Sequence, residues 1–442
     1  MAIMGEDPRR ADSEVPANGP AVVRDLVGPA DAQGPHGGSQ ASKKKGRRRK
    51  RRRPVYAAGG ESRVPPAAAA SRPAERRPQP GSAPQQTIAQ PAPHVVAEAA
   101  PRGQGDGLYA ALDLGTNNCR LLIARPRERG FHVVDAFSRI VRLGEGVGRS
   151  GRLGDAAMDR AVEALRICQA KLRDRGVVRA RLIATEACRA AENGAAFLER
   201  VLAETGLDLE IVSRETEARL AVSGCASLID PQTSGALLFD IGGGSSELVW
   251  IDLTRPADRH RRRMSDRIRT WASLPVGVVT LSERHGGELV DATVFEAMVA
   301  EVAAMLASFP DGAALDRAVA SGNLHMLGTS GTVTTLAGVH LGLARYDRRK
   351  VDGTWLSAEE VNQMMAVITG MDYAARVANP CIGRERADLV LAGCAILEAI
   401  RRRWPCQRLR VADRGLREGI LVEMMAEDGV WRRNPRQNGR TS

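Results

Sequence analysis

The chain has 442 residues, more than one domain of ordinary size, and a formal net charge of +12. Residues 1–107 carry 18 Lys and Arg against 10 Asp and Glu, so the remaining chain is close to neutral. No run of 18 apolar residues exists and the N-terminus lacks an apolar signal core, which argues against a membrane span and against secretion. The seven cysteines form no Cys-x-x-Cys pair, so we expect reduced thiols in a cytoplasmic protein.

Residues 1–107 are rich in Pro, Ala, Gly, Gln and Arg and have almost no aliphatic periodicity. This composition predicts a disordered basic tail. Within it, residues 43–53 include ten basic side chains in eleven. Such a run is either a solvated tail or an electrostatic tether for nucleic acid, anionic lipid or polyphosphate.

From residue 108 the chain alternates strand-like and helix-like segments, which is typical of an α/β protein. The pattern predicts strands at residues 109–113, 119–125, 133–141, 181–185 and 209–213. It predicts helices at residues 155–175, 195–205 and 215–228.

The opening strand–turn–strand pattern returns at residue 236, with an apolar strand at 237–241, a Gly/Ser turn and a second strand at 247–252. An internal repeat at this spacing predicts two duplicated domains with a cleft between them. We place these domains at residues 108–230 and 231–428, followed by a flexible C-terminus at 429–442.

Each of the two turns joins glycines to small polar residues, directly after an Asp near the end of a strand. Glycines expose backbone N–H groups to phosphate oxygens, and Asp113 or Asp240 can hold Mg²⁺. A third turn at residues 328–331 leads into a helix expected near Val333, whose N-terminus suits an anion, although Thr332 could simply cap that helix. The predicted phosphate-binding residues of these turns are Gly115, Thr116, Asn117, Gly242, Gly243, Gly244, Ser245, Ser246, Gly328, Thr329, Ser330 and Gly331.

Seven runs carry a family resemblance: LDLGTNNCRLLIA (112–124), ATEACRAAENG (184–194), SRETEARLA (213–221), DIGGGSSELV (240–249), GTSGTVTTLAG (328–338), RADLVLAGCAILEAI (386–400) and VADRGLREGIL (411–421). Together they resemble the exopolyphosphatase/guanosine-pentaphosphate phosphatase branch of the actin/Hsp70/sugar-kinase superfamily. The resemblance covers about residues 108–425 and implies two actin-like (ribonuclease H-like) domains. Longer members carry a further helical domain, so the chain is similar to the short, two-domain type.

The resemblance implies that Glu217 activates the attacking water. Glu215 and Glu217 stand two apart on a helix, so only one of them can face a cleft. The resemblance also implies that Glu247 joins Asp113 and Asp240 in binding Mg²⁺ or Mn²⁺. Two arginines, Arg120 and Arg189, are candidate phosphate clamps because guanidinium groups bind phosphate in a bidentate manner; the alternative for each is a surface ion pair.

We therefore expect an exopolyphosphatase that releases orthophosphate from the end of inorganic polyphosphate. Hydrolysis of guanosine pentaphosphate (pppGpp) at its 5′ end is the alternative with the same chemistry. An ATP-dependent small-molecule kinase and a non-catalytic nucleic-acid-binding protein are two further hypotheses; few aromatic residues are available for base stacking. The oligomeric state is left open, with a homodimer as one option.

Overall fold

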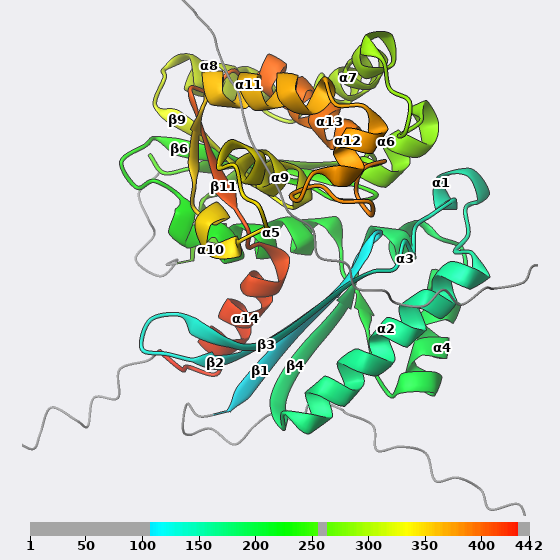
Figure 1. Ribbon diagram of the computed structural model, residues 1–442. Helices are drawn as coiled ribbons and strands as arrows, with labels where there is room; N and C mark the ends of the chain where they lie inside the picture. Colours follow the sequence, from blue (N-terminus) through cyan, green and yellow to red (C-terminus); the bar gives the residue numbers. More distant parts are fainter. Residues whose placement is uncertain (1–106, 255–262, 432–442) are drawn as a thin grey trace, which may run out of the picture. The chain divides into compact units, whose positions relative to one another are not determined.

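The computed structural model describes residues 107–254 and 263–431, which form two mixed sheets covered by helices (Figure 1). The first sheet has the strand order β3 (Phe131–Ile140), β2 (Asn118–Pro126), β1 (Leu108–Leu114), β4 (Val177–Ala184) and β5 (Glu210–Ile211). The second has the order β10 (Trp355–Ser357), β11 (Arg408–Ala412), β9 (Leu324–Thr329), β6 (Gly235–Ile241), β7 (Ser246–Asp252) and β8 (Ile268–Leu274). The predicted basic tail lies outside the described residues except for Gly107.

The helices fall into three groups along the chain. Those of the first part are α1 (Val147–Ser150), α2 (Asp155–Asp174), α3 (Glu186–Ala190) and α4 (Gly194–Thr205). Helix α5 (Arg214–Cys225), followed by a 3₁₀ turn at Ala226–Leu228, leads to the second sheet, and another 3₁₀ turn at Met264–Arg267 precedes β8. The later helices are α6 (Val278–His285), α7 (Ala292–Leu306), α8 (Gly312–Ala320), α9 (Gly331–His340), α10 (Arg348–Val351), α11 (Ala358–Thr369), α12 (Tyr373–Ala378), α13 (Val390–Arg403) and α14 (Leu416–Glu427).

The two sheets repeat one topology, which confirms the predicted duplication. Strand β1 pairs antiparallel with β2 and parallel with β4, and β6 pairs antiparallel with β7 and parallel with β9. In both sheets the tight hairpin therefore sits at the same place relative to the parallel strand. The domain boundaries at residues 230 and 231 stay a prediction.

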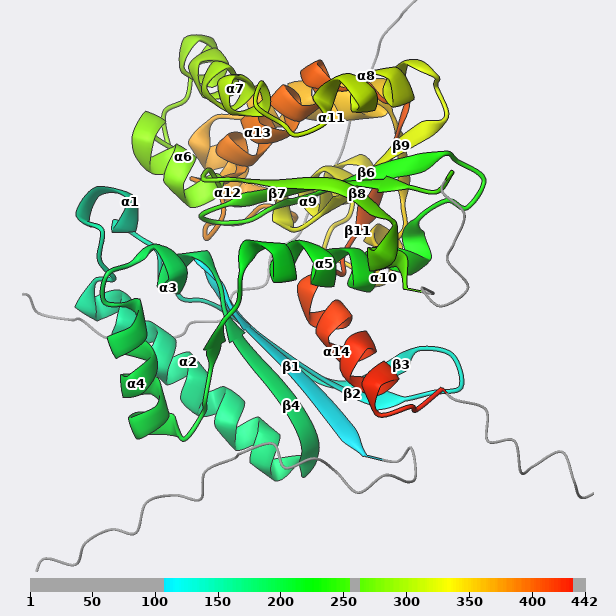
Figure 2. The same ribbon diagram turned by 180° about the vertical axis from the view of Figure 1, so that it is seen from behind.

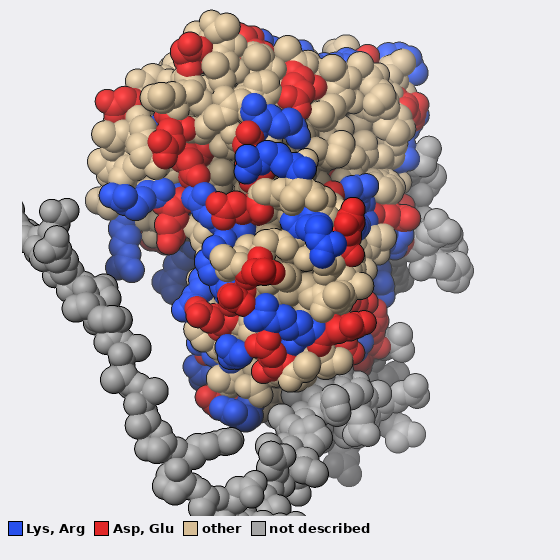
Figure 3. Space-filling view, turned by 90° about the vertical axis from the view of Figure 1, so that its right-hand side faces the viewer, with Lys and Arg blue, Asp and Glu red and all other residues tan. Residues whose placement is uncertain are grey.

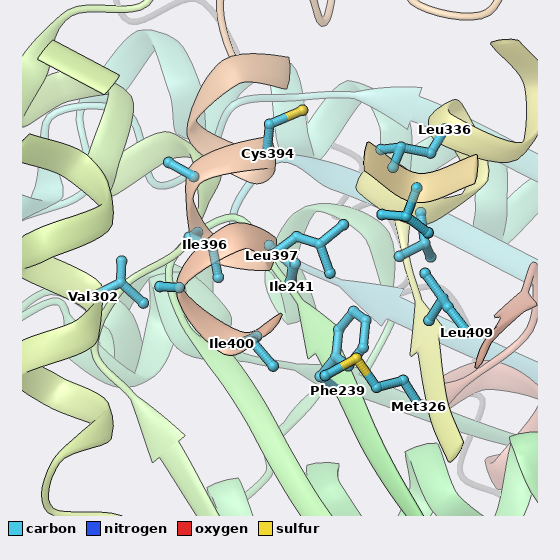
Figure 4. Packing of buried hydrophobic residues seen from close by; sticks show 14 of the residues in the cluster. Phe239, Ile241, Val302, Met326, Leu336, Cys394, Ile396, Leu397, Ile400 and Leu409 are labelled. Atoms are coloured by element: carbon cyan, nitrogen blue, oxygen red, sulfur yellow. The ribbon is translucent and has the colours of Figure 1, made fainter. Parts of the chain in front are cut away.

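Apolar side chains of the second sheet pack against α7, α9, α11 and α13. Figure 4 shows Phe239 and Ile241 of β6 facing Leu397 and Ile400 of α13, with Met326 of β9 beside them. On the first sheet, α2 and α4 cover one face (Figure 2). These cores hold the ends of β1 and β6, and with them the two glycine turns, in place.

Helix α5 is buried between the two sheets. Its residues Ala218, Ala221 and Val222 pack on the second sheet, and Leu220 packs on the opposite side against the first. Ala218 and Ala221 have small side chains that let the helix approach the second sheet closely, so Glu217 in its first turn is placed near both repeated hairpins.

The C-terminal helix α14 packs on the face of the first sheet that α2 and α4 leave open (Figure 2). Its Leu421 and Met424 lie against Tyr109 and Ala111 of β1. Glycines bring α14 backbone-close to α5, because a Cβ on Gly419 would lie 1.9 Å from the Leu220 carbonyl oxygen. The last helix therefore completes the core begun by the first strand.

Most predicted elements are confirmed within a few residues, and the differences have local causes. Strand β4 begins at Val177, four residues before the prediction, because it pairs with β1 along the whole of that strand. Strand β5 keeps only Glu210 and Ile211 of the predicted five residues. Helix α9 begins at Gly331, so Thr332 is not its cap.

In the described part of the chain, no helix is long and apolar enough to cross a membrane. Figure 3 shows Lys and Arg side chains intermingled with Asp and Glu on the face in view. That mixture agrees with the near-neutral charge expected of the residues after the tail.

Candidate active site

The N-terminal turn of α5 places Glu217 in the interior. Ser213 caps the helix by accepting a hydrogen bond from the backbone N–H of Thr216 at 3.2 Å. Residues two positions apart on an α-helix point about 200° away from each other. Glu215 is accordingly exposed, while the Glu217 side chain is only 14% exposed. The expectation that only one of the two faces inward holds.

Glu217 interacts electrostatically with three other carboxylates, those of Glu247, Asp113 and Asp240. Burial raises the pKa of Glu217 well above its ordinary value, and the negative charge of Glu247 raises it further. Burial and the same neighbour raise the pKa of Asp240 to about 7, and burial raises the pKa of Asp113. Repulsion between these groups means that the site favours bound protons or a bound cation at neutral pH.

The two hairpins place different partners opposite their aspartates. Asp113 of β1 stands across from Arg120 of β2, whereas Asp240 of β6 stands across from Glu247 of β7. The hydroxyl groups of Ser245 and Ser273 donate to Glu247 Oε1 at 2.7 and 2.8 Å. The first hairpin therefore pairs its aspartate with an arginine, whereas the second pairs its aspartate with another acid.

The predicted metal ligands are only partly brought together. Among residues 107–254 and 263–431, no group of three or more His, Cys, Asp or Glu side chains is placed to hold a metal ion. However, Asp113 Oδ1 and Asn117 Oδ1 are buried oxygens without a hydrogen-bond partner. Unpartnered buried oxygens are costly unless something else satisfies them, and a bound cation would satisfy the Asp113 oxygen.

The first and second glycine turns touch each other, at the place where a cleft was expected. A Cβ built on Gly243 would lie 2.9 Å from Thr116 Cβ, and one on Gly244 would lie 2.8 Å from Thr116 Oγ1. Gly115 closes its own turn by donating its N–H to the Asn118 carbonyl at 2.9 Å. Glycine is thus required in the second turn because Thr116 occupies the space that a side chain would need.

Two predicted hydroxyl donors of the second turn already have protein acceptors. Ser246 is fully buried and donates to the Val276 carbonyl at 2.7 Å, while Ser245 donates to Glu247. Gly242 donates its N–H to the Ser245 carbonyl at 3.0 Å. These contacts give both serines a part in shaping the turn, and phosphate binding by them stays a prediction.

The third turn joins β9 to α9 through a strained residue. Ser330 has a φ of 80°, a left-handed value that is rare for residues other than glycine, and donates to the Ile241 carbonyl at 2.7 Å. Thr329 donates to the Arg414 carbonyl, and Gly328 lies against the Phe239 ring, which a Cβ would approach to 2.6 Å. Gly331, at the start of α9, borders a charged group, since Arg386 Nη1 lies 3.9 Å from its Cβ position.

Three arginines interact electrostatically beside these turns. Burial lowers the pKa of Arg417 and of Arg386, and the charge of Arg120 lowers both further. In the described ranges none of the three has a carboxylate within ion-pair distance, although Arg386 donates weakly to the Cys381 carbonyl at 3.4 Å. Within the part of the chain that the structure describes, these three positive charges lie outside any ion pair, and Asp113 and Glu418 act on them only at longer range, so an anion is favoured among them.

Sequence reasoning proposed Arg120 but missed Arg386 and Arg417. Both lie in late segments, RADLVLAG and DRGLREG, in which no role could be given to a particular arginine. Packing of α14 and the loop before α13 brings them near the first hairpin. The available signal was an arginine directly after a glycine turn at a helix start, as in Gly415-Leu416-Arg417.

Arg189 is bound within the protein. It donates to Glu186 Oε2 at 2.9 and 2.5 Å, to the Val212 carbonyl at 2.7 Å and to Glu217 Oε2 at 3.2 Å. Every nitrogen of its guanidinium thus has an acceptor. Phosphate binding by Arg189 stays a prediction, and its contacts place it as a neighbour of Glu217.

The chain is similar to proteins of known sequence and structure. Residues 122–428 match the model of the Ppx/GppA phosphatase family. A guanosine-5′-triphosphate,3′-diphosphate pyrophosphatase of Aeromonas salmonicida is 28% identical over 73% of this chain, and the match spans 60% of that relative's length. The chain therefore corresponds to about three fifths of that curated relative.

Solved structures of the family have the same fold. The Aquifex aeolicus member of the Ppx/GppA family has a TM-score of 0.58 and 27% identity, over 73% of this chain and 98% of that one. An exopolyphosphatase from Cytophaga hutchinsonii has a TM-score of 0.63 and 23% identity, over 72% and 98% of the two chains. The resemblance found in the sequence motifs is confirmed, and the chain belongs to the Ppx/GppA phosphatase family.

Proposed function

We propose that the chain is a phosphoanhydride hydrolase that releases orthophosphate from the end of inorganic polyphosphate. One observation carries the proposal: the buried carboxylate of Glu217 lies among the aspartates of two touching glycine hairpins. A carboxylate removed from water is a stronger base than an exposed one, and phosphoryl transfer to water needs such a base beside positioned phosphates.

In this proposal, Arg120, Arg386 and Arg417 bind the phosphate chain. Guanidinium groups without acidic partners can each make two charge-assisted hydrogen bonds to phosphate oxygens. Backbone N–H groups of the glycine turns and the start of α9, beside Arg386, complete the anion site. The substrate charge then offsets the mutual repulsion of the three arginines.

Glu217 takes a proton from water while the water oxygen bonds to the terminal phosphorus. The P–O bond to the rest of the chain breaks, and the leaving phosphate oxygen keeps the electron pair. Arg189, which donates to Glu217 Oε2, holds the carboxylate in one orientation for this step. Glu247, fixed by Ser245 and Ser273, keeps the Glu217 pKa high through its charge.

A divalent cation such as Mg²⁺ or Mn²⁺ fits the aspartate side of the site. Asp113, with its unpartnered oxygen, and Asp240 would hold it, and Glu247 lies across from Asp240. Mg²⁺ is commonly bound by one or two carboxylates together with substrate phosphates, so three protein ligands are not required. Such an ion supplies neutralisation of charge on the phosphate oxygens.

The second candidate is hydrolysis of the 5′ end of pppGpp. The name of the Aeromonas relative supports it, since that protein is a guanosine-5′-triphosphate,3′-diphosphate pyrophosphatase. The chemistry at Glu217 is the same for both substrates, because each ends in a phosphoanhydride. They differ in the leaving group, which is a shortened polyphosphate chain in one case and a guanosine nucleotide in the other.

Phosphate release by the purified protein tests the proposal. Long polyphosphate, tripolyphosphate, pppGpp and ATP are compared at equal concentration, with Mg²⁺, with Mn²⁺ and with a chelator. Release from polyphosphate or pppGpp that requires the cation, and that Glu217→Gln abolishes, supports it. Release from none of the four, or equal release by Glu217→Gln, contradicts it.

A further inference from the structure

Glu186, to which sequence reasoning gave no role, is a buried acid between two arginines. Its side chain is 10% exposed and lies at the first residue of α3. Arg189 donates to Oε2 through Nε and Nη2, and Arg214 donates to Oε1 at 2.6 Å and to Oε2 at 3.2 Å. One carboxylate thus accepts four contacts from two guanidinium groups.

Of the two arginines, Arg189 also contacts Glu217, the candidate base. Arg189 Nη2 bridges Glu186 Oε2 at 2.5 Å and Glu217 Oε2 at 3.2 Å, and Nη1 is anchored on the Val212 carbonyl at 2.7 Å. The guanidinium plane is rigid, so three fixed acceptors determine its orientation. The Glu217 carboxylate then meets a donor in a set position.

Glu186 also lies beside the second glycine turn. A Cβ on Gly244 would come within 3.1 Å of Glu186 Cγ. The acid is therefore wedged between the phosphate turn and the two arginines, and it has little room to move. Loss of its charge would leave both guanidinium groups without their principal acceptor.

We propose that Glu186 is a positioning residue for the hydrolytic reaction: it orients Arg189, and through Arg189 it fixes the Glu217 carboxylate. This inference rests on the proposed function, in which Glu217 deprotonates water. A purely structural ion pair would support the fold but would leave kcat of the folded protein near the wild-type value.

The test compares the steady-state kinetics of wild type and Glu186→Gln on tripolyphosphate. We expect kcat to fall about 10- to 100-fold, the usual cost of a misplaced catalytic group, with KM changed less than about 3-fold. An unchanged kcat, or a raised KM with unchanged kcat, would overturn the proposal.

A double-variant cycle tests the route through Arg189. Arg189→Lys keeps the charge but cannot bridge all three acceptors, so it should lower kcat as well. If Glu186 acts through Arg189, kcat of the double variant should be no lower than kcat of the worse single variant. If the two fold-losses in kcat multiply instead, the residues act independently and the route through Arg189 is contradicted.

Glu192→Gln is the matched control, since Glu192 pairs with Arg152 in an exposed ion pair and should stay within about 2-fold of wild type. If Glu186→Gln melts below the assay temperature, Glu186→Asp carries the test, and we expect it to lower kcat with little change in KM. A wild type inactive on every phosphate chain refutes the proposed function, whereas an active wild type with an unaffected Glu186→Gln refutes this inference alone.

Discussion

Replacing Asp240 by Asn should stabilise the protein, and by more at pH 8 than at pH 5. Asp240 lies at the end of β6, away from water and near Glu247, and these two causes raise its pKa to about 7. Asn has nearly the same shape and no charge at any pH. The variant therefore removes the cost of ionising a buried carboxyl without creating a cavity.

The magnitude follows from proton binding. The carboxyl ionises near its ordinary value of 3.8 in the unfolded chain and near 7 in the folded one. Between these values the folded state binds more protons, so the free energy of unfolding of wild type falls as pH rises. At 1.36 kcal/mol per pH unit, the loss between pH 5 and pH 7 is about 3 kcal/mol, and it stays constant above pH 7.

Thermal unfolding followed by circular dichroism measures the effect in the presence of a chelator. At roughly 2 °C per kcal/mol, the Tm advantage of Asp240→Asn should be about 5 °C larger at pH 8 than at pH 5. Asp208→Asn, at an exposed site, is the control and should show no pH-dependent advantage. An equal Tm offset at both pH values would refute the reasoning.

The same samples test the cation site. Adding Mg²⁺ at pH 8 should raise the Tm of wild type, because a ligand that binds only the folded state stabilises it. The rise should be smaller for Asp240→Asn, which lacks one of the proposed ligands. Equal rises in both proteins would remove Asp240 from the cation site.

Four further results are expected. Glu217→Gln should lower kcat about 10²- to 10⁴-fold while substrate binding stays near normal, as measured by steady-state kinetics and calorimetry; more than a tenth of the wild-type rate would exclude Glu217 as the base. Arg417→Gln should raise KM for tripolyphosphate about 10-fold through loss of a charge-assisted contact, and an unchanged KM would place the phosphates elsewhere. Gly243→Val should lower both Tm and substrate affinity, since its side chain would meet Thr116, and a normal Tm would show that the two turns can separate. Deleting residues 1–107 should leave kcat on tripolyphosphate unchanged; if the basic run captures long chains, KM for long polyphosphate rises at low salt only, and equal KM values would exclude capture.

The repeated hairpins were predictable because their signal is local. An apolar strand, an Asp and a glycine turn specify a tight connection within about fifteen residues, and the second copy at residue 236 fixes the duplication. Helix α5 was predictable for the same reason, since Ser213 directly before it is a favourable N-cap residue. Family motifs then pointed to Glu217 among the acids of that helix.

The arginine side of the site could not be predicted in the same way. Arg386 and Arg417 lie more than 260 residues after Asp113 along the chain, and only packing brings them together. Likewise, sequence does not reveal whether a hydroxyl faces a ligand or a carbonyl, so the inward contact of Ser246 with Val276 needed the structure. A residue's local neighbours identify its element, whereas its partners depend on the whole fold.

The packing of α14 on the first sheet affects how the protein can be made. Tyr109 donates to Asp428 across 319 residues of chain, and the apolar face around Ala111 is covered by Leu421 and Met424. During synthesis the ribosome completes this sheet long before it completes its cover. The nascent chain therefore exposes this apolar face while the roughly 200 residues between β5 and α14 are made. At roughly 5–20 residues per second this takes about 10–40 s, and apolar surface exposed for that time is prone to aggregation.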